Sequence, residues 1–248
     1  MCVNQELDTV VAELAPTGRL RAAINFGNPV LAQRDAATGE AGGVSVGLAR
    51  ELARELDLPL DLVPFERAGE VSASATSGLW DVCFLAIDPK RAATISFTAP
   101  YVLIEGAYLV PDASDFRAVD DVDREGVRVL VGQDSAYDLF LTRTLTHATI
   151  VREVGQEALV PAFERGDADV LAGIRQPLEQ IAARLPGTRM LPGRFMAIEQ
   201  AMGSPAGKPA AAAFLRAFVQ DMIASGLVAR ALADSGRGEV TVASPTAP

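Results

Sequence analysis

Residues 78–101 read Gly-Leu-Trp-Asp-Val-Cys-Phe-Leu-Ala-Ile-Asp-Pro-Lys-Arg-Ala-Ala-Thr-Ile-Ser-Phe-Thr-Ala-Pro-Tyr, and this stretch decides the fold class. Its apolar run between Asp81 and Ile87 is typical of a strand in a parallel sheet that is covered on both faces. A polar turn follows, and Arg91 comes just after it. A guanidinium beyond a strand end can hold a small carboxylate through two parallel hydrogen bonds. Arg91 is therefore a candidate binding residue; the alternative is a surface arginine that pairs with Asp88 or with solvent.

Strand and helix patterns alternate along the chain, which predicts an α/β fold built from βαβ units. We predict strands over 19–24, 60–65, 81–87, 127–131 and 169–173. We predict helices over 44–56, 70–76, 136–145, 157–165, 176–185 and 208–225, and a hairpin-type turn over 35–43. The pattern restarts near residue 127, so the sequence indicates two α/β units that are separated near residues 111–124, a stretch rich in Asp and without periodicity.

Composition excludes several classes of protein. The 248 residues carry a formal net charge of −10 and no cluster of Lys or Arg, which disfavours nucleic acid as a partner. No apolar run approaches the roughly 18 residues of a membrane span, so we do not expect an integral membrane protein. Cys83 is expected to be a buried free thiol, and the single histidine, His147, is expected at the surface. Neither residue has the spacing of a metal site, and no P-loop or dinucleotide motif indicates a cofactor.

The first residues, Met-Cys-Val-Asn-Gln-Glu-Leu-Asp, have neither the basic region nor the apolar run of a signal peptide. Two possibilities stay open, a cytoplasmic protein and a chain from which a leader has been removed. Cys2 could also be the relic of a lipoprotein junction.

A predicted helix over 44–56 is followed in order by Gly78-Leu-Trp-Asp81, Asp88-Pro-Lys-Arg91, Ile95-Ser-Phe-Thr-Ala-Pro-Tyr101 and Ala107-Tyr-Leu-Val110. In this order the segments resemble the family 3 solute-binding proteins of bacterial ABC transporters, which are polar amino-acid binders with a type 2 periplasmic-binding fold. Asp88 and Arg91 take the threonine and arginine positions of the family's Thr-x-x-Arg turn. Residues 127–132 and 163–169 resemble the family's second lobe, so the likeness covers roughly residues 18 to 235.

The resemblance implies an α/β protein of two Rossmann-like lobes joined by two hinge strands. Residues 1–110 plus 196–236 would form the first lobe, 111–195 the second lobe and 237–248 a disordered tail. The ligand would lie between the lobes, and closure would bury it without covalent chemistry. The implied ligand is an amino acid or a related small organic acid. An ABC permease is the implied partner, the periplasm the implied location and a monomer the implied state, with no catalytic residue and no cofactor.

The resemblance also implies which residues contact the ligand. In the first lobe these are Arg91 on the α-carboxylate, Ala86 five residues before it, and Asn25, Phe26 and Asn28 on the wall of the cleft. In the second lobe the backbone N–H groups of Asp134, Ser135 and Ala136 would bind the same carboxylate at a helix start. Phe26 and Tyr137 are the stacking candidates, because each follows a strand end.

The departures from the family pattern concern the ligand ammonium. The second-lobe aspartate that usually holds it is Ile174 here, beside Arg175, and the family's Gly-Thr turn is aligned with Gln133-Asp134. Arg175 either pairs with Asp134 or Glu179, or binds a second anionic group and so favours a dicarboxylate or keto acid. Glu105 lies in an apolar strand, where a carboxylate needs a partner, so it is either salt-bridged or a ligand-binding residue. Asp134 or Glu105 could take over the ammonium.

Two other functions remain as alternatives. A dehydratase of the cyclohexadienyl type on the same fold would need a carboxylic acid near Ile174 and Arg175, where the sequence offers none. A cytoplasmic ligand sensor would explain the missing leader. Hydrolase chemistry is not indicated, because Ser135 lies in Gln-Asp-Ser-Ala rather than Gly-x-Ser-x-Gly.

Overall fold

The computed structural model describes residues 2–244. The chain forms two compact units. Unit 1 comprises Met1–Leu103 and Glu199–Pro248, and unit 2 comprises Ile104–Ile198. The chain leaves unit 1 within the long strand β6 (Ile95–Pro111) and returns within β11 (Met196–Pro205). The sequence places these boundaries at 110/111 and 195/196 instead. Both crossings lie inside continuous strands, so no turn or change of composition marks them.

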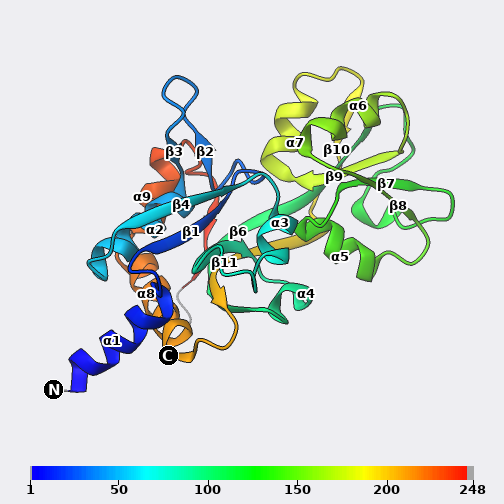
Figure 1. Cartoon of the computed structure of the whole chain (residues 1–248). Helices are drawn as coiled ribbons and strands as arrows, with labels where there is room; N and C mark the ends of the chain where they lie inside the picture. The colour runs from blue at the N-terminus through cyan, green and yellow to red at the C-terminus, as the bar shows by residue number, and fades with distance from the viewer. Residues whose placement is uncertain (1, 245–248) are drawn as a thin grey trace. The chain divides into compact units, whose positions relative to one another are not determined.

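Unit 1 has a sheet in which β1 pairs in parallel with both β4 and β5, while β11 pairs antiparallel with β5. Its strands are β1 (Leu20–Asn25), β2 (Gln33–Arg34), β3 (Ala41–Gly42), β4 (Leu60–Phe65), β5 (Val82–Ala86) and β12 (Thr241–Val242). Its helices are α1 (Cys2–Leu14), α2 (Val44–Glu55), α3 (Ala68–Ala73), α4 (Pro89–Ala92), α8 (Pro209–Ala224) and α9 (Leu227–Asp234). Helices α2 and α3 pack against β1 and β4, α9 packs on α2, and α1 lies along α8 (Figure 1).

Unit 2 repeats this plan with the strand order β6-β9-β7-β8, in which β7 is parallel to β8 and β9, and β6 is antiparallel to β9. Its further strands are β7 (Arg128–Gly132), β8 (Thr149–Glu153), β9 (Val170–Ile174) and β10 (Thr188–Met190). Its helices are α5 (Ala136–Thr144), α6 (Leu159–Glu164) and α7 (Arg175–Ala182), with short 3₁₀ turns at η1 (Val119–Asp121) and η2 (Gln156–Ala158). The predicted βαβ pattern is therefore confirmed in both units.

An arginine–aspartate pair joins the first central strand to its neighbour in each unit. In unit 1 the backbone N–H, Nε and Nη2 of Arg21 donate to the Asp81 carboxylate at 3.0, 2.9 and 2.8 Å. In unit 2 the same atoms of Arg128 donate to Asp169 at 2.8, 3.1 and 2.9 Å. The backbone N–H of each aspartate donates in turn to the carbonyl oxygen of its arginine, at 2.8 Å for Asp81 and 2.9 Å for Asp169. The two clamps differ in burial, because the Asp81 side chain is 0% exposed and that of Asp169 is 37% exposed.

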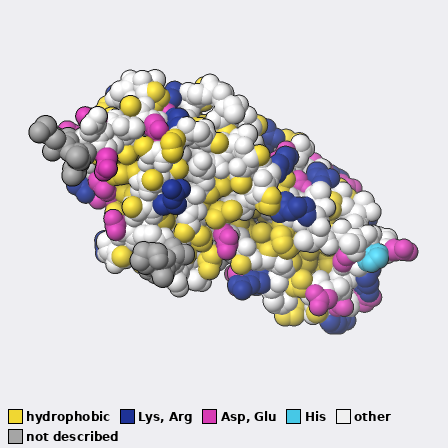
Figure 2. All heavy atoms as spheres, turned by 90° about the horizontal axis from the view of Figure 1, so that it is seen from below, with side chains coloured by type: hydrophobic (Ala, Val, Ile, Leu, Met, Phe, Trp, Pro, Cys, Tyr) yellow, Lys and Arg dark blue, Asp and Glu magenta, His cyan; other side chains and the backbone are white. Residues whose placement is uncertain are grey.

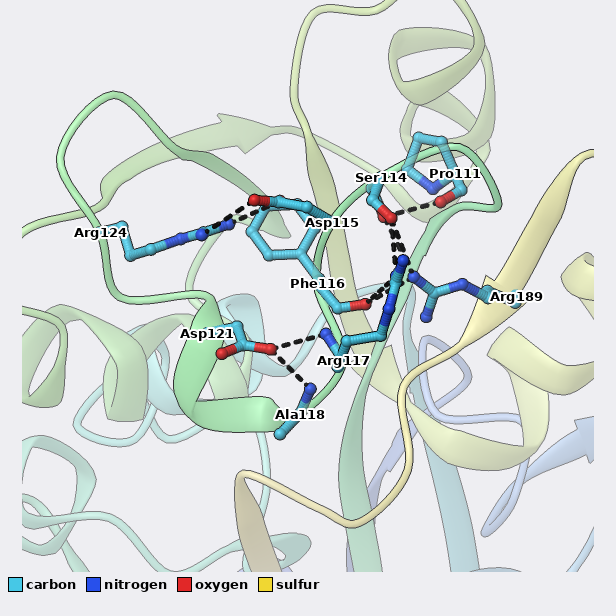
Figure 3. A network of polar contacts seen from close by, with 9 residues as sticks. All are labelled: Pro111, Ser114, Asp115, Phe116, Arg117, Ala118, Asp121, Arg124 and Arg189. Atoms are coloured by element: carbon cyan, nitrogen blue, oxygen red, sulfur yellow. Dashed lines mark hydrogen bonds and ion pairs between the residues drawn. The ribbon is translucent and has the colours of Figure 1, made fainter.

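Three arginines hold the loop that follows β6 (Figure 3). Arg117 and Arg189 both donate to the carbonyl oxygen of Phe116, whose side chain is buried. The guanidinium of Arg124 lies over the Phe116 ring at 4.8 Å from its centroid. The sequence separates the two units near this loop and counts residues 111–195 with the second lobe. In the structure the loop lies in unit 2, where side chain to backbone bonds hold it.

The end of the chain also differs from the prediction of a disordered tail over 237–248. Strand β12 pairs antiparallel with β6, with Thr241 opposite Leu103 and Val242 opposite Val102. Pairing with a distant strand orders a segment whose composition is typical of loops. The last part of the predicted tail, residues 245–248, lies outside the described residues.

The expectations for Cys83 and His147 are confirmed. Cys83 is buried in the core of unit 1 at 0% exposure, beside Trp80 at 1% exposure in the same cluster. His147 is exposed, and histidine surface is visible on the face drawn in Figure 2, where acidic and basic side chains are interspersed rather than gathered in a basic patch. Among residues 2–244 no single helix is long and apolar enough to cross a membrane, although α8 and α9, bent by 68°, pass that test together on length and composition.

Candidate functional site

Arg91 lies at the carboxyl end of β5. Asp88 accepts a hydrogen bond from the backbone N–H of Lys90 at 2.8 Å and so begins α4, with Pro89 in the first turn. The Arg91 side chain is 2% exposed, and its Nη1 donates to the Ala86 carbonyl at 3.1 Å. Ala86 therefore contributes through its backbone oxygen, which anchors the guanidinium against the end of the strand.

The loop after β1 lies beside this strand end, because β1 and β5 are neighbouring parallel strands. The side-chain oxygen of Asn25 accepts the N–H of Gly27 at 3.1 Å. The side-chain oxygen of Asn28, which is buried, accepts the N–H of Val30 at 3.2 Å. These bonds use the acceptor atoms of both amides to shape the loop. The sequence makes Phe26 a candidate for stacking on the ligand. One face of its ring is already covered by the Arg34 guanidinium, which lies 3.8 Å from the ring centroid.

Gln200, which the sequence offers together with Glu199 as either a structural or a ligand-binding residue, lies at this edge. It is 4% exposed and stands opposite Ala86 in the antiparallel pairing of β11 with β5. The two positions are more than a hundred residues apart, so only the strand pairing brings Gln200 to the Arg91 end of the sheet.

In unit 2 the turn between β7 and α5 is closed by its own side chains. Asp134 has φ 57°, its N–H donates to Asp138 Oδ2 at 2.8 Å, and the N–H of Ser135 donates to the Gly132 carbonyl at 3.2 Å. Two of the three amides expected to bind a carboxylate are thus engaged inside unit 2, which leaves that of Ala136. The positive φ places Asp134 in the left-handed region, which glycine favours and which few other residues adopt.

The buried carboxylate of Asp138 holds this turn. The carboxylate pairs with Nε of Arg152 at 2.9 Å. The backbone N–H of Asp138 donates to Oγ of Ser135, the N-cap residue of α5, at 3.0 Å. Tyr137, expected as a stacking residue, is instead 4% exposed in the core of unit 2. Burial raises the pKa of the Tyr137 phenol, whose oxygen lies 3.5 Å from Gln156 Nε2.

Arg175 and Glu105 form one ion cluster in unit 2. Nε of Arg175 donates to Glu105 at 2.6 Å, Nη2 donates to the Gly193 carbonyl, and Nη1 lies 3.8 Å from Glu179. The second oxygen of Glu105 accepts from Arg194 at 3.2 Å. The sequence predicts Asp134 or Glu179 as the ion-pair partner of Arg175. Within unit 2 the described partners of Arg175 are Glu105 and Glu179. The two charged residues that the sequence treats separately therefore neutralise each other.

Other parts of the described chain offer no competing chemistry. Among residues 2–244 no group of three or more His, Cys, Asp or Glu side chains is placed to hold a metal ion. A hollow of about 680 Å³ between α1 and α8 is lined mainly by Leu7, Val10, Ala213 and Phe214. A second, of about 410 Å³, lies beside the β2–β3 hairpin. Neither hollow contains a predicted ligand-binding residue.

An α/β unit that is interrupted by a second one, with the chain crossing in two long strands, defines a type 2 periplasmic binding protein. The chain belongs to the bacterial extracellular solute-binding proteins, family 3, whose family model matches residues 20–234. A comparison with curated proteins gives no match.

Solved structures share the fold at low sequence identity. A mutant of the Thermotoga maritima protein ArgBP is 19% identical with a TM-score of 0.76, covering 92% of this chain and 99% of that one. A solute receptor for L-cysteine from Neisseria gonorrhoeae is 20% identical with a TM-score of 0.77, covering 91% and 92%. The ancestral amino-acid-binding protein AncCDT-1, a precursor of cyclohexadienyl dehydratase, is 20% identical with a TM-score of 0.73, covering 92% and 98%.

Proposed function

We propose that this solute-binding protein captures a small ligand with one carboxylate, an amino acid or a related organic acid, for uptake by an ABC permease. The observation that carries the proposal is Arg91, a guanidinium 2% exposed and anchored by the Ala86 carbonyl at the carboxyl end of a parallel strand. Ligands of open α/β sheets bind outside such strand ends. A buried guanidinium is best compensated by a carboxylate, which it binds through two charge-assisted hydrogen bonds.

The neighbouring residues complete the proposed site. Asn25 and Asn28 use their side-chain oxygens to shape the loop, so their amide N–H groups are the atoms we assign to the ligand. We assign Phe26 to the wall of the site. In unit 2 the amides of Asp134 and Ser135 are engaged within the turn, so we propose the backbone N–H of Ala136, at the start of α5, as the further contact.

The charge of the ligand follows from the ion cluster of unit 2. Arg175 has Glu105, Glu179 and the Gly193 carbonyl as partners, and Glu105 is shared with Arg194. A second ligand carboxylate would have to displace Glu105 from Arg175, which favours a monocarboxylate over a dicarboxylate. Binding of amino acids by structural relatives, such as the receptor for L-cysteine, supports the same class. We further propose a periplasmic location and a monomeric state, which are the expectations that the resemblance to the family implies.

A thermal-shift screen over amino acids, keto acids and dicarboxylates tests this function, because a ligand that binds only the native state raises the melting temperature. Any hit is then titrated by calorimetry against Arg91→Lys, which keeps the charge and loses the two-pronged geometry. We expect binding to weaken by about tenfold to a hundredfold, as befits one charged hydrogen bond. The matched control is Arg54→Ala, an exposed arginine paired with Glu51 on α2, which should bind as the wild type does.

Two results would contradict the proposal. A screen without any stabilising ligand would refute the ligand class. A hit that binds Arg91→Lys and Arg91→Ala as tightly as it binds the wild type would remove Arg91 from the site.

Dehydration is the second candidate function, favoured by the structural likeness to the precursor of cyclohexadienyl dehydratase. A dehydratase needs a carboxylic acid that delivers a proton to its substrate. Both oxygens of Glu105 are engaged by arginines, and Ile174 occupies the neighbouring strand end. We therefore expect incubation with prephenate or arogenate to give no product, and turnover of either compound would establish the enzyme.

A further inference from the structure

The C-terminal strap, residues 235–243, contacts the crossing strand β6 at its last positions in unit 1. Strand β12 pairs with Val102 and Leu103, and the N–H of Ala243 donates to the Tyr101 carbonyl at 3.0 Å. In an antiparallel pair alternate residues bond to the same neighbour, so Tyr101 and Leu103 face the strap and Val102 faces away. The strap therefore covers the edge of β6 just before the chain passes into unit 2.

The other end of the strap contacts the loop at the carboxyl end of β1. Nε2 of Gln33 bridges the Pro29 carbonyl at 2.9 Å and the Ser235 carbonyl at 3.4 Å. Nη2 of Arg237 donates to the same Pro29 carbonyl at 3.5 Å. Pro29 follows Asn28 directly, so these bonds hold the loop that carries the proposed ligand amides.

The strap is anchored by two buried side chains, while Gly236, Gly238 and Glu239 between its contacts are exposed. Val240 and Ala243 are 6% and 5% exposed, and the N–H of Val240 donates to the Arg237 carbonyl at 3.0 Å. The segment that contacts the loop and the segment that pairs with β6 are thus one continuous ordered piece of backbone.

We propose that the C-terminal strap is a positioning device, which holds the Asn25–Asn28 loop in its ligand-competent form and keeps the crossing end of β6 in the sheet. It touches no proposed ligand group, so it acts through the backbone of both segments. Its effect on affinity rests on the proposed function, whereas its effect on β6 does not. A loop that samples other conformations lowers the apparent affinity by the fraction of molecules that are competent.

Two truncations of the full chain test the strap. Ending the protein after Val240 removes β12, and ending it after Ser244 removes only residues 245–248 and serves as the control. Amide hydrogen exchange is read at Leu103, which is paired with Thr241, and at Val102, which faces away from the strap. We expect exchange at Leu103 to speed up by about tenfold or more in the shorter protein, while Val102 keeps its rate and acts as an internal control.

Binding is measured on the same proteins with the ligand found in the thermal-shift screen. We expect the protein that ends after Val240 to bind roughly three- to tenfold more weakly, and the control truncation to bind as the full chain does. Arg237→Ala should speed exchange at Leu31 and Ala32, whose N–H groups donate to the Asn28 carbonyl, with Arg230→Ala on α9 as the control.

Each outcome decides a part of the proposal. Unchanged exchange at Leu103 would overturn the strap, and faster exchange at Leu103 with unaltered affinity would overturn its positioning role. If the wild type binds nothing in the screen, the proposed function fails, while the exchange experiment still decides whether β12 holds β6. If the shorter truncation does not fold, Ala243→Pro removes only the N–H that bonds Tyr101, and Ala243→Gly retains it as the control.

Discussion

The buried clamp of unit 1 should be worth far more than its counterpart in unit 2. Asp81 is fully buried and accepts three hydrogen bonds from Arg21. Asp81→Asn keeps the shape of the side chain, but it removes the charge and turns an amide donor toward a guanidinium. Removing one partner of a buried ion pair costs about 3 to 5 kcal/mol, and we expect the lower end because the substitution is isosteric.

This cost is large enough to measure as a shift of thermal unfolding. For a protein of this size 1 kcal/mol corresponds to about 2 to 4 °C, so Asp81→Asn should lower the melting temperature by roughly 6 to 12 °C. The assay is differential scanning calorimetry at neutral pH and without ligand. Asp169→Asn is the matched variant, with the same hydrogen bonds to Arg128 but a side chain 37% exposed. Solvent screens that pair, so its loss should cost clearly less.

The comparison refutes the reasoning in two ways. A shift for Asp169→Asn that equals or exceeds that for Asp81→Asn would show that burial does not set the strength of the clamps. A change of less than about 1 °C for Asp81→Asn would mean that desolvation of the buried pair offsets its attraction in the native protein.

Two further predictions concern the backbone and the acid stability. Gly43→Ala should destabilise unit 1 by about 2 kcal/mol or more, because φ is 98° and a Cβ would lie 2.5 Å from the Leu31 carbonyl oxygen. Gly39→Ala is the control, because Gly39 also has a positive φ, 73°, but open space around its Cβ position. An equal loss of stability in both variants would exclude the steric clash. Burial acts to raise the pKa of Asp123, but hydrogen bonds from the backbone N–H groups of residues 146–148 and from the Thr146 hydroxyl lower it well below its usual range. Asp123 therefore stabilises the fold above about pH 4 and loses this effect as the pH falls through the folded-state pKa. In urea unfolding, wild type and Asp123→Asn should differ at pH 7, and the difference should shrink steadily as the pH is lowered below about 4. A difference independent of pH would contradict the assignment.

Local patterns were sufficient for most of the secondary structure. The strand over 60–65 is observed with the predicted bounds, and the helix predicted over 44–56 is α2 (Val44–Glu55). The elements that sequence reasoning missed are α1, β8, β10, α9 and β12. Most are short or lie near a terminus, and strands of two or three residues exist only because a neighbouring strand supplies their hydrogen bonds.

For the candidate site, the position of Arg91 beyond a strand end followed from the sequence, since it depends only on the order of an apolar run, a capped turn and a charge. The partners of the charged residues did not. Arg175 pairs with Glu105, which lies 70 residues earlier in the chain, and Gln200 reaches the end of β5 through strand pairing. Tyr137 packs inward, although its position after a strand end made it a candidate for contact with the ligand.

By itself the sequence determined the α/β class, the family and the place of Arg91, the candidate ligand-binding arginine, because periodicity, turn residues and the order of motifs are properties of neighbouring residues. Only the tertiary structure decided which charges are neutralised, which aromatic ring is buried and where the end of the chain is bound. Those features depend on contacts between residues far apart in the chain, such as Thr241 and Leu103, and no local pattern records such contacts. The same reason explains why a tail with the composition of a loop is an ordered strand on β6.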